Sequence, residues 1–519
     1  MLTVNKTKSD IKKSSPQRPS LVINAISTWV ALGVNIIVVL LLTPFIIGHL
    51  GENGFGIWVL VGSFLGYYGL LNLGVRAAAM RYIARYAGQG HEKALNETAS
   101  TTMAMFSCTG VLAIVVSFFL AAPLASFFDV APEHVNDFKH VIWILGLATG
   151  LSFPSNVFES IVVAHERYVA INSAKIVCTL VRVGFVVLML LRGQGLVGVA
   201  CATLIATIVA FVANFLIYRH FTPQVRLRCA SAKWGVFRML LVYGGVTTVI
   251  VIADIMRFNF GSIVVGKCVG IPEVGVYGIA AMIIRYMLRI ITAGMSVLVP
   301  RFAALDGAKE NAKLQSLFMR SMSVSAVLGF GAGMMAIIFG GRFIILWVGK
   351  EFTGAVPVTG AIPVLWILAI SYAFALSQAP GINLMYALNK HYYYAVVTIL
   401  EAGANVIISI LLAPKYGIIG VAFGTAIPML TVKLFVQPIY VAHIVGISIW
   451  DYIKRIIIPA TLAGLMIGMA YSLGNVISLD KYSLAGFVTW GIISGLIFVG
   501  IVFVVFRQVG FWLPVGKRS

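Results

Sequence analysis

The chain has 519 residues, of which 60% are hydrophobic and 11% are charged, and its mean hydropathy is +0.98. This composition excludes an ordinary soluble protein, because apolar residues far outnumber what soluble domains could bury. The formal net charge of +21, from 38 Lys and Arg against 17 Asp and Glu, would indicate a polyanion binder in a soluble chain. In a membrane protein, its meaning depends on where the charges lie.

Fourteen stretches of the sequence are long and apolar enough to form spanning helices, each of which takes about 20 mostly apolar residues. In chain order they are predicted at residues 20–48, 53–75, 97–123, 139–164, 168–190, 195–218, 236–265, 274–299, 316–346, 359–387, 391–413, 417–444, 452–474 and 483–506. The connections are short and leave no room for a soluble domain. The sequence therefore predicts an all-α polytopic membrane protein. Its first apolar stretch is too long for a cleaved signal sequence and is expected to remain as a helix.

The basic residues fall mainly on one side of this predicted topology. With the N-terminus inside, the inner segments hold 25 of the 38 Lys and Arg residues, and the outer loops hold 7. Short loops rich in Lys and Arg stay on the cytoplasmic side of a membrane. We therefore expect both termini in the cytoplasm. Most of the net charge is then a consequence of topology and requires no nucleic-acid partner.

Two short motifs recur along the chain at nearly the same offset. Residues 51–57 (GENGFGI) match residues 270–276 (GIPEVGV), and residues 195–203 (GLVGVACAT) match residues 417–425 (GIIGVAFGT). The pair Arg81-Tyr82 likewise corresponds to Arg301-Phe302. Each offset spans six predicted helices, an even number, so the halves share one orientation and form a parallel repeat.

The repeat predicts four segments. We expect a cytoplasmic N-terminal tail at residues 1–19, an N-terminal lobe of six helices at 20–232 and a C-terminal lobe of six helices at 233–446. Two appended helices and a cytoplasmic tail are expected at 447–519.

Nine ionisable residues are predicted at bilayer depth, where such groups normally face a protein interior or a water-filled path. Arg285 and Arg289 are four residues apart, so they share one helical face. We interpret the nine as lining a cavity between the halves, with a net positive charge suited to phosphate or acidic sugars. The candidate substrate-binding residues are Lys175, Arg182, Arg257, Arg285, Arg289 and Lys433, and the candidate ion-coupling residues are Glu159, Asp254 and Glu401.

A second interpretation of these residues is purely structural. Asp254 could pair with Arg257, which lies three positions later, and Glu159 could pair with Lys175 or Arg182. Long basic side chains could also extend to the membrane surface. Under this interpretation the acids are counter-ions and carry no coupling ion.

The chain resembles the polysaccharide flippases of the multidrug/oligosaccharidyl-lipid/polysaccharide exporter superfamily. The resemblance rests on the fourteen spans, the parallel repeat and the two glycine motifs. The resemblance covers residues 20 to about 505. It implies a MATE-like fold whose two lobes enclose a V-shaped cavity. It also implies alternating access that carries a polyprenyl-pyrophosphate-linked oligosaccharide from the inner to the outer leaflet of a bacterial or archaeal plasma membrane. The appended helices would offer a surface to the polyprenyl tail.

The resemblance also implies partners and a driving force. Membrane lipids, the lipid-linked glycan and other polysaccharide-assembly proteins are the expected partners. An ion gradient is the expected driving force, because the sequence contains no Walker-type phosphate-binding motif. The five cysteines form no C-x-x-C pair and no His lies at ligand spacing, so neither a disulfide framework nor a metal site is expected. No cofactor is expected either.

Two other functions fit parts of this sequence. An ion-coupled small-molecule exporter of the multidrug type would share the fold, but the first two spans contain no acid and the predicted cavity is positive, which disfavours cationic drugs. A membrane enzyme of the same pathway would need a sizeable outer loop with catalytic residues. The longest outer connection, near Phe128 to Phe138, is roughly fifteen residues long and carries no Arg. A transporter is therefore the expectation.

Overall fold

The computed structural model describes residues 21–72, 74–353 and 360–476, with 486, 489–491, 493–496 and 500 near the C-terminus. The regular structure of these residues is entirely helical. A spanning chain needs this, because each backbone N–H and C=O must be bonded within its own segment. The predicted all-α polytopic fold is confirmed. The predicted tail at 1–19 and most of the last predicted span lie outside the described residues.

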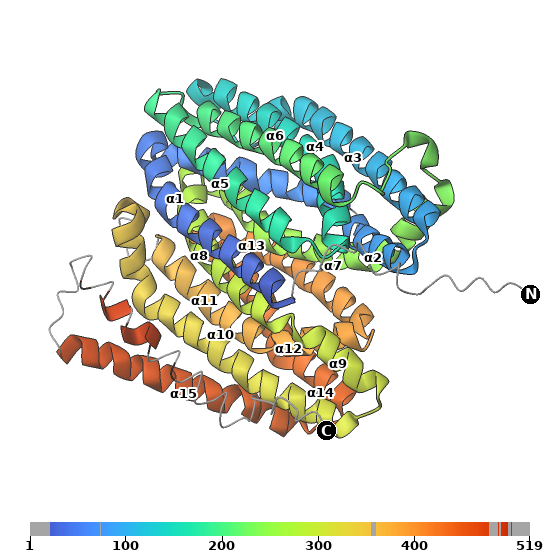
Figure 1. Ribbon diagram of the computed structural model, residues 1–519. Helices are drawn as coiled ribbons and strands as arrows, with labels where there is room; N and C mark the ends of the chain where they lie inside the picture. The colour runs from blue at the N-terminus through green and yellow to red at the C-terminus, as the bar shows by residue number, and fades with distance from the viewer. Residues whose placement is uncertain are drawn as a thin grey trace, which may run out of the picture. The chain divides into compact units, whose positions relative to one another are not determined.

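The helices follow one another with short connections (Figure 1). Their bounds are α1 (Leu21–Gly66), α2 (Val75–Gln89), α3 (Glu92–Phe127), α4 (Val135–Ala164), α5 (Tyr168–Leu191), α6 (Gly195–Phe221), α7 (Trp234–Cys268), α8 (Ile271–Met295), α9 (Leu298–Gly307), α10 (Asn311–Val348), α11 (Ala361–Ser377), α12 (Ala379–Ala387), α13 (His391–Thr431), α14 (Gln437–Val445) and α15 (Ile449–Val476).

Within the described residues, eight helical stretches are long and apolar enough to cross a membrane, or nine if α11 and α12, bent by 41°, form one span. Two of these stretches, Ile23–Asn72 and Tyr392–Val445, contain 50 and 54 residues. Each is long enough for two crossings and covers two of the predicted spans. The structure merges these spans because no loop separates them.

Glycines with positive φ mark where the merged helices break. Gly51 has φ 67° inside α1, and Gly417 has φ 58° inside α13. Gly195 (φ 50°) begins α6, and Gly270 (φ 156°) immediately precedes α8. These are the first residues of the two repeated sequence motifs. Glycine adopts positive φ without the steric cost of a Cβ, so both copies of each motif begin a helix in the same way.

The first compact unit comprises Met1–Leu42, Leu71–Pro123 and Val135–Thr247. In it, α6 packs against both α4 and α5, and α3 to α6 lie side by side (Figure 1). Aromatic contacts also join α4 to α6. The ring of Phe158 on α4 stacks on the ring of Tyr218 on α6, with the ring centres 5.3 Å apart.

The second unit comprises Thr43–Leu70, Leu124–His134 and Thr248–Ser519. In it, α10 packs against α11 along one side and against α15 along another. Part of its core lies around Phe302, Phe318 and Tyr452, which are fully buried. The division into lobes at residues 232 and 446 stays a prediction.

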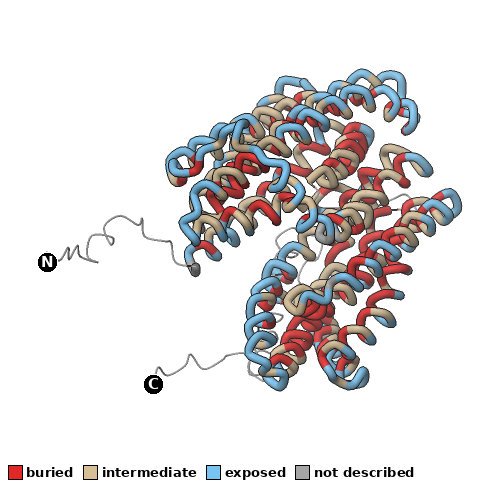
Figure 2. The backbone as a smooth tube through the Cα atoms, turned by 90° about the vertical axis from the view of Figure 1, so that its right-hand side faces the viewer, coloured by how far each residue is buried: buried red, intermediate tan, exposed pale blue. Residues whose placement is uncertain are grey.

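Large apolar side chains are also exposed on the outer sides of the helices. Figure 2 shows exposed residues along the outward faces and buried residues where neighbouring helices pack. Leu41, Phe119, Leu216 and Leu400 are among the most exposed. So many exposed large apolar side chains are expected in a nonaqueous environment, in agreement with a multi-pass membrane protein.

The second half of α1 packs closely against α8 inside the second unit. A Cβ added to Gly56 would lie 2.1 Å from the carbonyl oxygen of Ile271, and one added to Gly275 would lie 3.2 Å from the Phe55 ring. Small residues let helix backbones approach in a membrane, where dispersion contacts stabilise association. Gly56 and Gly275 occupy equivalent positions in the repeated motif.

We predict that Gly56→Ala destabilises the protein by about 1–3 kcal/mol, because the added methyl meets a backbone carbonyl that cannot rotate away. The matched control is Gly62→Ala on the same helix, where no atom lies within 4 Å of the new Cβ. Thermal unfolding of the two purified variants measures the difference. Equal stability of the two variants would contradict the close contact.

Candidate functional site

A buried ion pair in the second unit joins two of the predicted membrane-depth residues, Arg257 and Glu401. Nη2 of Arg257 on α7 lies 2.9 Å from Oε1 of Glu401 on α13, and the two side chains are only 9% and 3% exposed. Nη1 of Arg257 also donates a hydrogen bond to Oδ1 of Asp254 at 3.3 Å. Asp254 is 44% exposed. The guanidinium is therefore neutralised by one deeply buried carboxylate and one accessible carboxylate.

Lys433 lies where the helix after α13 changes its hydrogen-bond pattern. Residues Val432–Val436 form a π-helix between α13 and α14. Pro438 lacks an N–H, which interrupts the α-helical ladder at this point. The Gln378 side chain donates a hydrogen bond to the Lys433 carbonyl oxygen. Short π segments of this kind are frequent at functional sites.

The Lys433 ammonium is itself fully enclosed by polar and aromatic groups. Nζ donates a hydrogen bond to Oε1 of Gln437 at 2.6 Å and lies 5.5 Å from the centre of the Tyr394 ring. The Tyr452 hydroxyl donates to Oε1 of Gln378 at 3.0 Å, extending this network to α15. A buried ammonium costs free energy unless such partners replace water.

A small cavity adjoins the Arg257 pair. It is lined by Arg257, Phe258, Tyr277, Ala281, Ile284, Arg285, Leu368, Tyr372 and Thr425. Phe258 and Tyr372 stack with their ring centres 6.0 Å apart. The cavity volume of about 10 Å³ is room for one water molecule. Aromatic hydroxyls and a second guanidinium therefore share this space.

Arg285 and Arg289 differ from Arg257, which is held by two carboxylates. Among the described residues, neither guanidinium forms an ion pair with a carboxylate. Arg289 is exposed, and its guanidinium lies 5.6 Å from the centre of the Tyr286 ring. Four predicted cations therefore meet only two carboxylates in this unit, and both carboxylates contact Arg257. Of the three cations that form no ion pair within the described residues, Lys433 is buried, and the other two lie on α8.

The remaining predicted residues lie in the first unit. Oε1 of Glu159 accepts contacts from both Lys175 Nζ and Arg76 Nη2, each at 2.8 Å. Nη1 of Arg76 donates to Oδ1 of Asn156 at 3.3 Å. Arg182 lies two turns beyond Lys175 on α5 and is half-buried. The pairs Glu159–Lys175 and Asp254–Arg257 are those of the structural interpretation.

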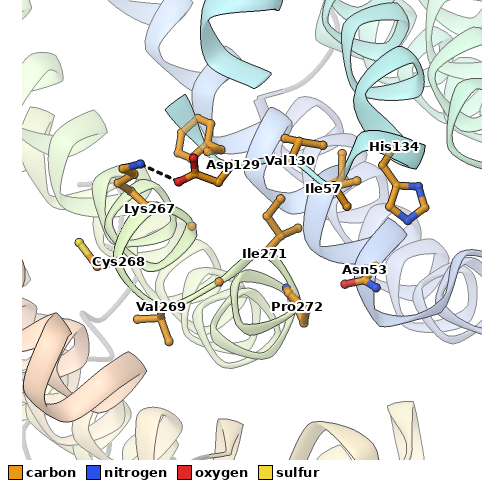
Figure 3. Close-up of a pocket in the computed structure, with 14 residues that line it drawn as sticks. Asn53, Ile57, Asp129, Val130, His134, Lys267, Cys268, Val269, Ile271 and Pro272 are labelled. Carbon is orange, nitrogen blue, oxygen red and sulfur yellow. Dashed lines mark hydrogen bonds and ion pairs between the residues drawn. The ribbon is translucent and has the colours of Figure 1, made fainter. Parts of the chain in front are cut away.

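A larger cavity of about 320 Å³ lies elsewhere in the second unit (Figure 3). Its lining includes Asn53, Asp129, His134 and Lys267. Nζ of Lys267 pairs with Oδ2 of Asp129 at 2.7 Å. None of the nine membrane-depth residues lines this cavity. Because the Lys267 ammonium is already paired with Asp129, the cavity is a weaker candidate for an anion site.

Sequence reasoning missed several members of the site. Tyr277, Tyr372, Gln378 and Gln437 carry no formal charge, so a pattern of charged residues does not include them. A signal was present, because each Gln precedes a proline by one or two residues at membrane depth. Arg76 was assigned to an inner connection, and nothing local to its sequence indicates Glu159 as its partner.

Comparison with known proteins finds one matching family and two relatives that are similar over most of the chain. The family described as polysaccharide biosynthesis protein matches residues 87–357, just over half of the chain. The putative O-antigen transporter of Shigella flexneri is 21% identical over 401 residues, which cover 76% of this chain and 92% of that protein. The uncharacterized membrane protein EpsK of Bacillus subtilis (strain 168) is 21% identical over 454 residues, covering 85% and 87%.

Two solved structures show the same fold. The lipid II flippase MurJ in an inward closed conformation has a TM-score of 0.68 at 14% identity, covering 94% of this chain and 99% of that one. An inward-facing multidrug resistance MATE family transporter of the MOP superfamily has a TM-score of 0.65 at 14% identity, covering 82% and 96%.

We predict that Arg257→Ala lowers the free energy of unfolding by about 3–5 kcal/mol, because it leaves the buried Glu401 carboxylate without its partner. Lys313→Ala is the control. It removes an exposed pair with Glu310 at 2.9 Å and should change stability by less than about 1 kcal/mol. Denaturant unfolding of the purified proteins measures both, and equally small losses would show that the Arg257 pair is not structural.

Proposed function

We propose that this chain, which belongs to the family of polysaccharide biosynthesis proteins in the MOP superfamily, moves a polyprenyl-pyrophosphate-linked oligosaccharide from the inner to the outer leaflet. The protein is a multi-pass membrane transporter and not an enzyme. The proposal adds the substrate, the direction and the driving force. The names of the Shigella O-antigen transporter and the lipid II flippase support a lipid-linked glycan as the cargo.

The observation that carries the proposal is the unneutralised positive charge on α8. Arg257 is held by Glu401 and Asp254, whereas Arg285 and Arg289 form no ion pair among the described residues. Planar guanidinium groups bind phosphate oxygens through paired hydrogen bonds. We assign the pyrophosphate to Arg285 and Arg289, with Lys433, Lys175 and Arg182 as further members of the cationic path. The same charges would repel a cationic drug.

The conformation described leaves little space beside Arg285. A cavity that holds one water molecule cannot take a pyrophosphate. Substrate binding therefore requires a second conformation in which the helices around Arg285 separate. We propose alternating access as the source of that conformation.

An ion gradient is the proposed driving force, with Asp254 as the residue that binds the coupling ion. Asp254 is far more exposed than Glu401, and its contact with Arg257 is longer, 3.3 Å against 2.9 Å. Asp254 can therefore exchange a proton or cation while Glu401 continues to neutralise Arg257. Glu159, held by Arg76 and Lys175, is the equivalent candidate in the first unit.

We place the protein in a bacterial or archaeal plasma membrane with both termini in the cytoplasm. The support is the concentration of Lys and Arg in the predicted inner segments. Other polysaccharide-assembly proteins are the proposed partners, because the glycan must be made on one side of the membrane and used on the other.

We expect Arg285→Ala combined with Arg289→Ala to abolish the appearance of polysaccharide at the surface of cells that depend on this chain. Each lost charge-assisted hydrogen bond is worth about 1.5–3 kcal/mol, so each single variant should reduce export about 10- to 100-fold. Surface glycan is measured at matched levels of membrane-inserted protein.

Arg192→Ala, an exposed arginine just after α5, provides the matched control and should leave export unchanged. Normal surface polysaccharide in the double variant would exclude Arg285 and Arg289 from the pyrophosphate site.

Asp254→Asn should retain the fold yet lose gradient-driven transport, because the amide keeps the side chain's shape but cannot take up a proton. Proteoliposomes with and without an imposed proton gradient give the measurement. The wild-type protein should transport faster with the gradient, and the variant should be indifferent to it. An undiminished response in the variant would remove Asp254 from the coupling mechanism.

A further inference from the structure

A groove in the first unit combines basic and aromatic side chains at one end of α6. It has a volume of about 660 Å³ and is lined by Met103, Phe158, Phe215, Tyr218, Arg219, Pro223, Arg226, Leu227 and Arg228. Three arginines therefore border a floor of aromatic rings. None of the nine membrane-depth residues belongs to it.

The loop that carries two of these arginines has a fixed backbone. Oδ1 of Asn96 on α3 accepts a hydrogen bond from the Arg226 amide at 2.8 Å, and Oγ of Ser100 accepts one from the Arg228 amide at 3.1 Å. The buried Tyr218 hydroxyl donates to the Val225 carbonyl oxygen at 2.5 Å. These side-chain contacts hold the loop, so the positions of the arginines are set by α3 and α6.

The charge of the groove is positive and unneutralised. Its lining contains no acidic residue. Glu97, on the same part of α3, is engaged by Lys233 at 2.6 Å. Among the described residues, no carboxylate pairs with Arg219, Arg226 or Arg228, and all three are exposed. If these arginines served only to orient the chain in the membrane, their charge alone would be enough. The aromatic floor beside them also provides a surface on which a ligand can bind.

The apolar face of α6 leads directly to these arginines. Ile208, Val212 and Phe215 are exposed at spacings of four and three residues, so they form one stripe along the helix. Arg219 continues the same stripe about 6 Å beyond Phe215, at 1.5 Å per residue. An amphiphile with a hydrocarbon chain on the stripe would place its head group among the arginines.

We propose that this groove binds an anionic phospholipid, with the phosphodiester at Arg219, Arg226 and Arg228 and an acyl chain along α6. Basic pockets next to spanning helices at the cytoplasmic surface suit such head groups, and guanidinium groups suit phosphate oxygens. The charge bias of the sequence assigns this end of α6 to the cytoplasmic leaflet. The site is additional to the proposed transport of a glycan and does not depend on it.

The test compares retention of two lipids by the purified full-length protein. Native mass spectrometry counts bound phosphatidylglycerol and phosphatidylcholine with identical acyl chains. The wild-type protein should retain phosphatidylglycerol preferentially. Arg226→Gln combined with Arg228→Gln should lower that retention about tenfold or more, since each basic residue adds to the attraction of an anionic head group. Arg192→Gln, on another connection, is the matched control.

Two further variants keep the test decisive if the double Gln variant does not fold. Arg226→Lys combined with Arg228→Lys should retain most of the preference, because the charge remains. Phe215→Ala should weaken retention of phosphatidylglycerol without altering charge, because it removes one ring of the aromatic floor. Glycan transport is not measured, so a negative result leaves the proposed function unaffected.

Three outcomes would overturn the proposal. The first is equal retention of the two lipids by the wild-type protein. The second is unchanged phosphatidylglycerol retention in the folded Gln and Phe215→Ala variants. The third is complete displacement of the lipid by inorganic phosphate at low millimolar concentration, which would indicate a site for soluble anions.

Discussion

A charge buried at membrane depth must be neutralised, and in this chain Glu401 neutralises Arg257. The pair joins α7 to α13, and the cavity that holds one water molecule lies beside it. Because Arg257 already has two carboxylates, it is a poor candidate for binding a phosphate. Arg285 and Arg289, which lie one turn apart on α8, form no ion pair among the described residues. The two carboxylates on Arg257 are therefore the basis for proposing Arg285 and Arg289, and not Arg257, as the cations available to a ligand.

The sequence predicted the class of fold, most of the helices and the residues that carry charge. Its glycine motifs also indicated where helices begin, and Gly51, Gly270, Gly195 and Gly417 have positive φ at those points. It could not predict that Gly56 packs on the backbone of Ile271, because such contacts depend on how distant helices pack. The hydrogen bond of Gln378 to Lys433 escaped prediction for the same reason, since it joins helices far apart in the sequence.

The excess of basic residues serves three purposes in this account. Most of it is proposed to direct topology, because Lys and Arg keep short loops in the cytoplasm. A smaller part lies within the membrane, where Arg285 and Arg289 are proposed to bind a pyrophosphate. A third part, Arg219, Arg226 and Arg228, borders the aromatic groove on α6 and is proposed to hold a phospholipid head group. The proposed role of a basic residue thus depends on its depth in the membrane and on the side chains around it.

The most direct test of the central claim is flipping by the purified protein in proteoliposomes that contain defined fluorescent glycolipids. A polyprenyl-pyrophosphate oligosaccharide is compared with the same oligosaccharide on an uncharged polyprenyl ether, and access of a glycan-cleaving enzyme reports the outer leaflet. Our account predicts that only the pyrophosphate-linked substrate crosses at a rate above that of protein-free vesicles. Equal movement of both glycolipids, or no movement of either, would contradict it.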